Sequence, residues 1–499
     1  MSKDEIRVHY SGFIIFAAQI LSVATGIIFT LLLTRNMTKQ QYGIWSNIFD
    51  LVGYFTLFSG LFPFWATRFV ARRKEGAIKT GLLANLIVAL VSMAVYFPLI
   101  SIVTSAFNIA GAYIIVYLVA SLQIINVYMI GMLESCLRSI KPQTIGYGLL
   151  IEEACKVSLA YVLIVELHQL FLGAMLSLIV AASIQALYYV RLLAKDLRQR
   201  IRWNYLREWL KGSTANLYNA VGNQLAAFIF ILLFLYGGQA ARGEYQAAAT
   251  FANVVGYSSF LAFALYPKML AKNSLEDVAS SFKIVLMFAI PMATIAITMS
   301  KSLLTILNVF YGQASPILIL LTLDAVVLLV SQFYSSLIFG VEKLDEEAKI
   351  PLGKLVRSKM FKVFTLPYIQ AAIAVPTAYL VLTGLATDQS VNAVTYVTGI
   401  NLCVHVAAFL GMYAIMRKSV RISVPWRSMG KYVFASTLTA AVLYFLPHPT
   451  TIVLTLSKVG AGVGAYTLLL LAIDVEAREL VASIWHEIKG TFGGFGSRD

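Results

Sequence analysis

Several ionisable side chains stand inside long apolar stretches of this 499-residue chain. Asp50 shares one helical face with Asn47, and Asp324 interrupts an apolar run by itself. A charged group at the centre of a bilayer costs about 2.5–3.5 kcal/mol on insertion scales, so such residues usually face a polar cavity or a partner of opposite charge. Both acids are therefore candidates for taking up a proton or contacting a polar ligand, and structural ion pairing is the competing interpretation.

A second ionisable group lies on one expected helix. Glu152 and Lys156 are one helical turn apart, a spacing at which their charges neutralise one another. Glu153 lies about 100° further round the helix. Two roles are open for this group: a buried ion pair that fastens helices, or ion coupling and substrate contact.

Uncharged amides recur at helical spacing in two other segments. Gln19 stands among hydroxyl residues on one segment, whereas Asn216, Asn219 and Asn223 follow one another along the second. Amides that face lipid lack hydrogen-bond partners, so these side chains are expected to line a polar cavity or to bind neighbouring helices. Amides and hydroxyls suit sugar recognition, although helix packing is their commoner use.

These residues are positioned by about fourteen apolar stretches of membrane-spanning length. A helix of ~20 apolar residues matches a hydrocarbon core of ~30 Å, and 59% of the residues are hydrophobic whereas only 13% are charged. The expected spans are 10–34, 43–66, 80–104, 111–135, 143–165, 170–192, 213–237, 245–267, 283–307, 316–341, 361–384, 391–416, 432–447 and 450–473. The sequence therefore predicts an all-α polytopic membrane protein.

The loops between these spans are alternately basic and nearly free of Lys and Arg. Of the 39 Lys and Arg residues, 33 fall in the segments that one topology places in the cytosol. Cytosolic loops carry this excess in membrane proteins, so we expect a multi-pass protein of the cell membrane with both termini in the cytosol. The formal charge of +15 has the same origin, and no nucleic-acid partner is expected.

A shift of 203 residues relates the two halves of the chain. It pairs Lys39 with Arg242 and Tyr54 with Tyr257, and it covers an even number of spans. Two six-helix units of the same orientation are therefore expected. The expected division is an N-terminal lobe at 1–193, a basic cytosolic crossover linker at 194–212, a C-terminal lobe at 213–416, two further helices at 417–473 and an amphipathic cytosolic tail at 474–499.

Several features of the sequence argue against an enzyme. The expected outer loops are a few residues long, and no Gly-Lys-Ser/Thr loop for phosphate binding occurs. Three scattered cysteines predict neither a disulfide framework nor a metal site. We expect no catalytic activity, no cofactor and no bound metal; a membrane glycosyltransferase or polymerase is the enzyme alternative, and such enzymes generally need a sizeable outer loop.

The connection between the first two spans resembles a known family. Leu33-Thr34-Arg35-Asn36-Met37-Thr38-Lys39-Gln40-Gln41-Tyr42-Gly43 has the family's basic residue, short turn and Tyr-Gly entry, and Gly60 with Ala66-Thr67-Arg68-Phe69-Val70-Ala71-Arg72 matches the end of its second span. On these motifs the chain resembles the Wzx-type polysaccharide flippase branch of the multidrug/oligosaccharidyl-lipid/polysaccharide (MOP) exporter superfamily. Gln41 and Phe58-Ser59 depart from the pattern, because acidic residues are common there.

This resemblance implies a MATE-like fold of two six-helix lobes plus two C-terminal helices. It also implies an alternating-access flippase that moves a polyprenyl-phosphate-linked or pyrophosphate-linked oligosaccharide from the cytosolic to the outer leaflet, for surface polysaccharide or glycoprotein biosynthesis. Its partners would be this lipid-linked oligosaccharide and membrane lipids, with glycan assembly enzymes as further candidates.

Two arginines match the family pattern. Arg35 and Arg68 would bind the substrate phosphate or line the cavity; alternatively, Arg35 caps the first span and Arg68 belongs to a basic cytosolic loop. Coupling to a proton or sodium gradient is open. An ion-coupled exporter of drug-like cations with the same fold is the nearest alternative, because the acids within the spans would suit a cationic substrate.

Overall fold

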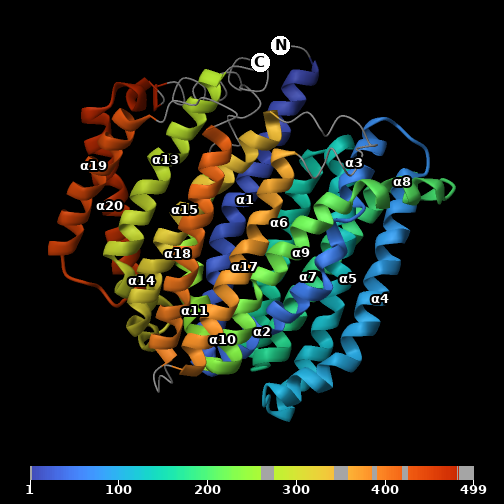
Figure 1. Cartoon of the computed structure of the whole chain (residues 1–499), viewed down its shortest axis with the longest axis horizontal. Coiled ribbons are helices and arrows are strands. Elements are labelled where there is room, and N and C mark those ends of the chain that lie inside the picture. Colours follow the sequence, from blue (N-terminus) through green and yellow to red (C-terminus); the bar gives the residue numbers. More distant parts are fainter. Residues whose placement is uncertain are drawn as a thin grey trace, which may run out of the picture. The chain divides into compact units, whose positions relative to one another are not determined.

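The computed structural model describes residues 3–259, 275–341, 358–384, 390–417, 425–479 and 481–482. These residues are nearly all helical, and the described part contains no strand (Figure 1). The α-helices are α1 (Lys3–Asn36), α2 (Lys39–Phe55), α3 (Pro63–Ala71), α4 (Ala77–Ala106), α5 (Gly111–Ile140), α6 (Gln143–Ala160), α7 (Leu170–Leu192), α8 (Asn204–Gly212), α9 (Thr214–Ala226), α10 (Phe228–Tyr236), α11 (Gln239–Ala252), α13 (Leu275–Thr298), α14 (Ser300–Leu307), α15 (Ser315–Val341), α17 (Lys359–Gly384), α18 (Ser390–Arg417), α19 (Trp426–Phe445) and α20 (Ile452–Ile473). Short 3-10 or π segments are η1 (Leu57–Gly60), η2 (Tyr161–Glu166), η3 (Asp196–Arg198), η4 (Asn253–Tyr257) and η5 (Val309–Ala314).

The helices fall where the hydropathy pattern predicts the spans. In the described part of the chain, ten helical segments are long and apolar enough to cross a membrane, or eleven if the bent pair α2–α3 is one span. Two further predicted spans coincide with α6, which carries Glu152, Glu153 and Lys156, and with α19. The predicted span 245–267 lies on α11 and η4 as far as residue 259, and its remainder lies outside the described residues.

Two compact units make up the structure. Unit 1 consists of Met1–Thr250 and Ser331–Ser419, and unit 2 consists of Phe251–Val330 and Val420–Asp499. The chain passes into unit 2 within α11 and returns within α15. The lobe boundaries expected from the sequence remain a prediction.

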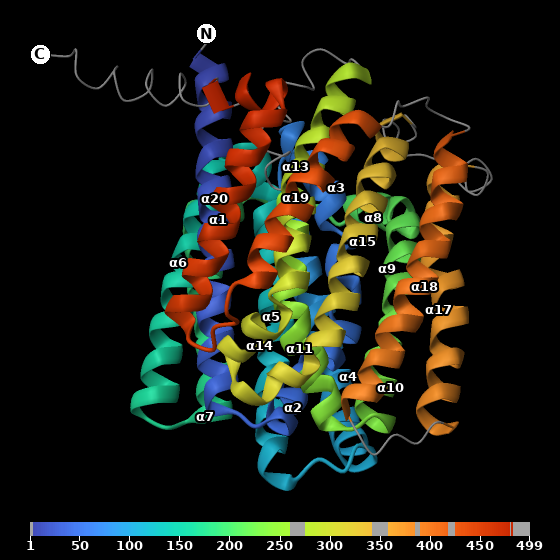
Figure 2. The same ribbon diagram turned by 90° about the vertical axis from the view of Figure 1, so that its left-hand side faces the viewer.

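Packed helix pairs form the core of unit 1. Here α1 packs along α6, α5 packs against α4 and α7, and α17 packs against both α9 and α18. Figure 2 shows α17 and α18 as neighbouring orange helices.

The crossover helix α8 is anchored by an aromatic cluster. Trp209 on α8 is fully buried and packs edge-on against Phe69 at 5.5 Å between ring centroids. Phe62 and Tyr205 complete the cluster. The sequence predicts a helix lying on the inner leaflet, and Trp203, which is 51% exposed, fits that position. Trp209 instead fastens the linker to α3.

Unit 2 fastens its two last helices to α13. Tyr466 on α20 donates a hydrogen bond to the carbonyl of Met287 at 2.7 Å. Lys431 on α19 forms an ion pair with Asp474 at 3.0 Å, just after α20. Most of the predicted amphipathic tail lies outside the described residues.

Candidate functional site

The second predicted span is a broken helix whose first half starts with a strong cap. The Thr38 hydroxyl accepts a hydrogen bond from the Gln41 amide at 3.2 Å, and the Gln41 side chain accepts one from the Thr38 amide at 2.9 Å. This reciprocal pair is a capping box. Gln41 departs from the acidic residue of the family pattern, yet it supplies the same acceptor oxygen.

The span breaks after Phe55 and bends by 49°. Pro63 starts α3, as its missing N–H permits at a first helical position. Carbonyl groups freed by a break in the membrane need donors. Tyr128 donates to the Phe55 carbonyl at 3.0 Å, and Ser213 donates to the Leu61 carbonyl at 2.5 Å. The break is therefore a stable feature held by side chains from α5 and from the segment before α9.

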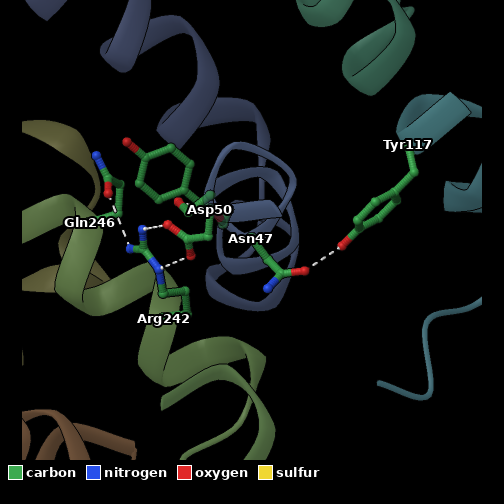
Figure 3. A network of polar contacts seen from close by, with 7 residues as sticks. Asn47, Asp50, Tyr117, Arg242 and Gln246 are labelled. Carbon is green, nitrogen blue, oxygen red and sulfur yellow. Dashed lines mark hydrogen bonds and ion pairs between the residues drawn. The ribbon is translucent and has the colours of Figure 1, made fainter. Parts of the chain in front are cut away.

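Asp50 on α2 and Arg242 on α11 form a two-pronged ion pair within unit 1. The Arg242 Nε and Nη2 atoms donate to the two carboxylate oxygens at 2.7 and 2.8 Å, and Nη1 donates to Gln246 at 3.1 Å (Figure 3). Arg242 is only 4% exposed, and its guanidinium also lies 5.1 Å from the Phe230 ring centroid. Removing one partner of such a buried pair typically costs about 3–5 kcal/mol.

The same two helices touch through their backbones. A Cβ built on Gly43 would lie 1.8 Å from the Gln239 carbonyl oxygen, and one built on Gly243 would lie 2.2 Å from the Lys39 carbonyl oxygen. Only glycine fits either position. Beside this contact, Lys39 and Glu244 form a second ion pair at 2.5 Å, and the Glu244 side chain is fully buried.

The crossing is symmetric in the sequence. Gly43 meets residue 239 and Gly243 meets residue 39, so a shift of 200 residues relates the two contacts. The sequence suggests a shift of 203, which pairs Lys39 with Arg242. In the structure Lys39 instead corresponds to Gln239, because Lys39 meets Gly243 and Gln239 meets Gly43.

A hydrogen-bond chain leads from α2 into the neighbouring helices. Tyr117 on α5 donates to the Asn47 side-chain oxygen at 2.9 Å, and Tyr96 on α4 donates to the Tyr117 carbonyl at 3.1 Å. Asn47 is fully buried, and its Nδ2 donors have no partner among the described residues. Both Asn47 and Asp50 thus bind protein partners, and their place along a polar cavity stays a prediction.

The ion pair on α6 differs from the one expected. Lys156 pairs with Glu153 at 2.6 Å and not with Glu152. Glu153 faces α1, where Ser22 and Thr25 donate to its oxygens at 2.7 and 2.5 Å. These hydroxyls hold Glu153 beside Lys156, since they complete the hydrogen bonds of its carboxylate.

Glu152 is left without a direct partner. In the described part of the chain, its carboxylate accepts no hydrogen bond and forms no ion pair, although Lys156, Glu153 and Glu134 lie within its electrostatic reach. Glu134 on α5 accepts from Tyr189 at 3.1 Å. This group therefore has three acids and one lysine, of which Glu153 and Lys156 are buried and Glu134 and Glu152 are half-buried.

The asparagine row on α9 remains accessible. Asn223 is exposed, whereas Asn216 and Asn219 are half-buried. The Asn223 amide donates to the backbone carbonyl of Asn219 at 2.9 Å and to its side-chain oxygen at 3.3 Å. The opposite face is closed by rings, with Tyr218 stacked on Tyr368 at 4.4 Å between centroids. Gln19 on α1 is also half-buried. Of these four amides, Asn223 is exposed and the other three are half-buried, and their role in a polar cavity stays a prediction.

Arg35 and Arg68 do not form one phosphate site. Arg35 is exposed in the last turn of α1, whereas Arg68 lies on α3, beyond the break. The 17 residues of α2 between them span roughly 25 Å at 1.5 Å per residue. The Arg68 guanidinium stacks 3.7 Å from the Phe64 ring centroid and donates to the Phe64 carbonyl.

Asp324 belongs to unit 2. It lies on α15 and is 6% exposed, in agreement with the burial expected of it. Asp324 is therefore not part of the candidate site in unit 1.

The sequence did not reveal Arg242 as the partner of Asp50, nor Glu244 as the partner of Lys39. Arg242 and Glu244 look like loop residues, because the expected span begins at residue 245, but α11 already starts at Gln239. Two features of the sequence indicated this arrangement. Gln239-Ala240-Ala241 consists of helix formers, which favours an earlier helix start. A single Arg next to a glycine has the charge needed to pair with the single Asp of a neighbouring span.

Comparisons with known proteins agree with this architecture. No family model and no curated protein matches the sequence. Among solved structures, an inward-facing multidrug resistance MATE family transporter of the MOP superfamily is 13% identical, with a TM-score of 0.59 over 80% of this chain and 96% of that chain. A MOP superfamily transporter from Pyrococcus furiosus, described as having a binding pocket of reverse polarity that suggests a different function, is 13% identical with a TM-score of 0.52 over 83% and 95%. A MATE in complex with MaL6 matches with the same identity and a TM-score of 0.52 over 82% and 95%. The chain has the all-α fold of the MATE transporters of the MOP superfamily.

Proposed function

We propose that this protein is an alternating-access flippase for a polyprenyl-phosphate-linked or pyrophosphate-linked oligosaccharide. The fold supports transport, because the solved structures that share it are transporters. The motif from Leu33 to Gly43 and the basic cytosolic segments support the lipid-linked glycan as substrate, since its anionic phosphate enters from the cytosolic leaflet. The protein would act in the cell membrane with both termini in the cytosol.

The pairing of three acids within unit 1 is the observation that carries this choice of substrate, and Glu152 is an exception because it forms no ion pair among the described residues. Asp50, Glu153 and Glu244 are each neutralised by a cation of the same unit. A site for a cationic drug would need uncompensated acids, whereas the accessible amides of Asn219 and Asn223 suit hydroxyl groups. An anionic, hydroxyl-rich head group therefore fits this unit better than a cation does.

An exporter of drug-like cations is the second candidate. The MATE neighbour described as a multidrug resistance transporter favours it, and so does the unpaired Glu152. The Pyrococcus furiosus neighbour, with its pocket of reverse polarity, illustrates that the fold accommodates different pockets.

Coupling to an ion gradient belongs to the same proposal. Glu152 and Asp324 are the coupling candidates, and Asp50 is weaker because Arg242 already neutralises it. Unchanged transport under an imposed pH gradient in Glu152→Gln and Asp324→Asn would remove this assignment. Glycan assembly enzymes would act as partners on the same lipid.

The proposal is tested by deleting the gene in its host and quantifying the lipid-linked oligosaccharide. An impermeant glycan-modifying reagent applied to intact cells reports on which leaflet holds it. The flippase account predicts accumulation of the complete lipid-linked glycan on the cytosolic side and loss of surface glycan, both reversed by re-expression of the wild-type chain.

Two other outcomes contradict the proposal. Normal outer-leaflet glycan in cells that become sensitive to cationic compounds would assign the exporter function. Incomplete glycan in the deletion strain would indicate an enzyme that builds or joins the glycan.

A further inference from the structure

We propose that α2 and the start of α11 form a gate on the outer side of the transport path, closed in this structure by the Gly43 and Gly243 contacts and by two ion pairs. The inference rests on the proposed alternating-access function. It also rests on the predicted topology, in which Lys39 and Gln239 begin their helices at the outer surface.

The glycines make the closure tight. Because the backbone of each helix occupies the place where the other helix would carry a Cβ, no side chain, water or solute fits between Gly43 and Gly243. Lys39 meets Gly243 and Gln239 meets Gly43, so both helices contribute equal lengths to the contact. The first turns of α2 and α11 are thus equivalent and meet at one point, as the two sides of a closed gate would.

The ion pairs allow this closure to be reversed. Lys39–Glu244 lies beside the glycine contact, and Asp50–Arg242 lies further along α2. Burying two opposite charges removes their hydration, and the attraction between the charges roughly offsets this desolvation penalty. Opening the crossing to water would return that hydration to all four side chains, so separation costs less than for an apolar seal of the same area.

Both helices of the gate end in irregular turns. α2 is followed by η1 and then by Pro63, and α11 is followed directly by η4. Such breaks absorb backbone rotation and serve as hinges. Tyr117 meanwhile binds Asn47 and holds α2 against α5. The crossing with α11 is therefore the surface that separates when the gate opens.

Reversible cross-linking tests the gate. In a variant whose native Cys136, Cys155 and Cys403 are replaced by Ala, Lys39→Cys and Glu244→Cys are joined by a short bis-methanethiosulfonate linker. The expected result is loss of glycolipid flipping in vesicles, restored by a reductant. Each single-cysteine variant is compared with the same variant without linker, and the linker should not lower its transport. The linker should likewise leave unchanged the transport of a matched cysteine pair at the Lys283–Glu476 ion pair.

Full transport by the quantitatively cross-linked Lys39→Cys/Glu244→Cys protein would overturn the gate. This failure differs from failure of the proposed function, in which the untreated protein flips no lipid-linked glycan at all.

A second measurement is independent of any transported substrate. Ser46 is buried on α2, one turn before Asp50, and its hydroxyl bonds only to its own helix at Tyr42. Ser46→Cys should be protected from an impermeant maleimide in the cysteine-free background. Adding Asp50→Arg should raise its labelling rate by about tenfold, a typical size for a coupling between two states.

The charge swap completes the test. Adding Arg242→Asp to Asp50→Arg rebuilds the ion pair with opposite polarity and should return the labelling rate to that of Ser46→Cys alone. Equal labelling in all three proteins would contradict the gate, whatever the transported substrate.

Discussion

Asp50 and Arg242 are 192 positions apart in the chain, and the carboxylate of the first accepts two hydrogen bonds from the guanidinium of the second. This pair joins α2 to α11 within unit 1. Because both side chains are largely withdrawn from solvent, neither can lose its partner without leaving a buried charge.

The first prediction concerns this pair. Asp50→Asn should lower the thermal unfolding midpoint of the purified protein, corresponding to a loss of about 3–5 kcal/mol, since it leaves the Arg242 charge unpaired. Glu208→Gln, at an exposed carboxylate of α8, is the matched control and should change stability little. The double variant Asp50→Arg/Arg242→Asp should recover most of the loss; if it unfolds as early as Asp50→Asn, the pair does not stabilise the fold.

The second prediction concerns the glycine contact. Gly243→Ala places a methyl group against the Lys39 carbonyl and should destabilise the protein by about 1–3 kcal/mol through overpacking. Gly26→Ala is the control, because no atom lies within 4 Å of the added carbon. Thermal unfolding of both variants checks this, and equal midpoints would show that the two helices do not touch as described.

The third prediction concerns the crossover helix. Trp209→Ala removes a fully buried indole and should cost about 3–5 kcal/mol. Trp203→Ala, at a half-exposed indole of the same linker, should cost far less. Proteolysis at the linker in detergent reports the difference as faster cleavage of the Trp209 variant only. Equal cleavage would mean that membrane contact, not the aromatic cluster, holds this linker.

The fourth prediction separates two neighbouring acids. Glu153→Gln leaves Lys156 without its ion pair and should lower stability, and Glu153→Gln/Lys156→Met should restore it. Glu152→Gln breaks no described hydrogen bond, so it should unfold like the wild type while losing the response of transport to a pH gradient. A gradient response that survives in Glu152→Gln would assign coupling elsewhere.

The fold was predictable because lipid imposes simple rules on sequence. Apolar runs of fixed length predict α1, α4, α5 and most other helices closely. The break in α2–α3 was harder to see, since it depends on Tyr128 and Ser213 supplying donors from segments distant in sequence.

The candidate site was predictable only in part. The acids Asp50 and Glu153 stand out as charges in apolar stretches, but their partners depend on which helix faces which. Arg242 resembles a loop cation in sequence, and Glu152 resembles the better partner for Lys156 at a spacing of four. The structure selects Glu153, because hydroxyls on α1 face that side of α6.

The central claim is that this chain moves an anionic lipid-linked glycan across a bilayer. The most direct measurement reconstitutes the purified protein in vesicles with a polyprenyl-pyrophosphate-linked oligosaccharide and follows the protection of the glycan from an external glycan-modifying reagent. The account predicts rapid exchange of the glycan between leaflets, slowed by Asp50→Arg and recovered by Asp50→Arg/Arg242→Asp. Exchange no faster than in protein-free vesicles, with gradient-driven movement of a cationic drug in the same preparation, would contradict it.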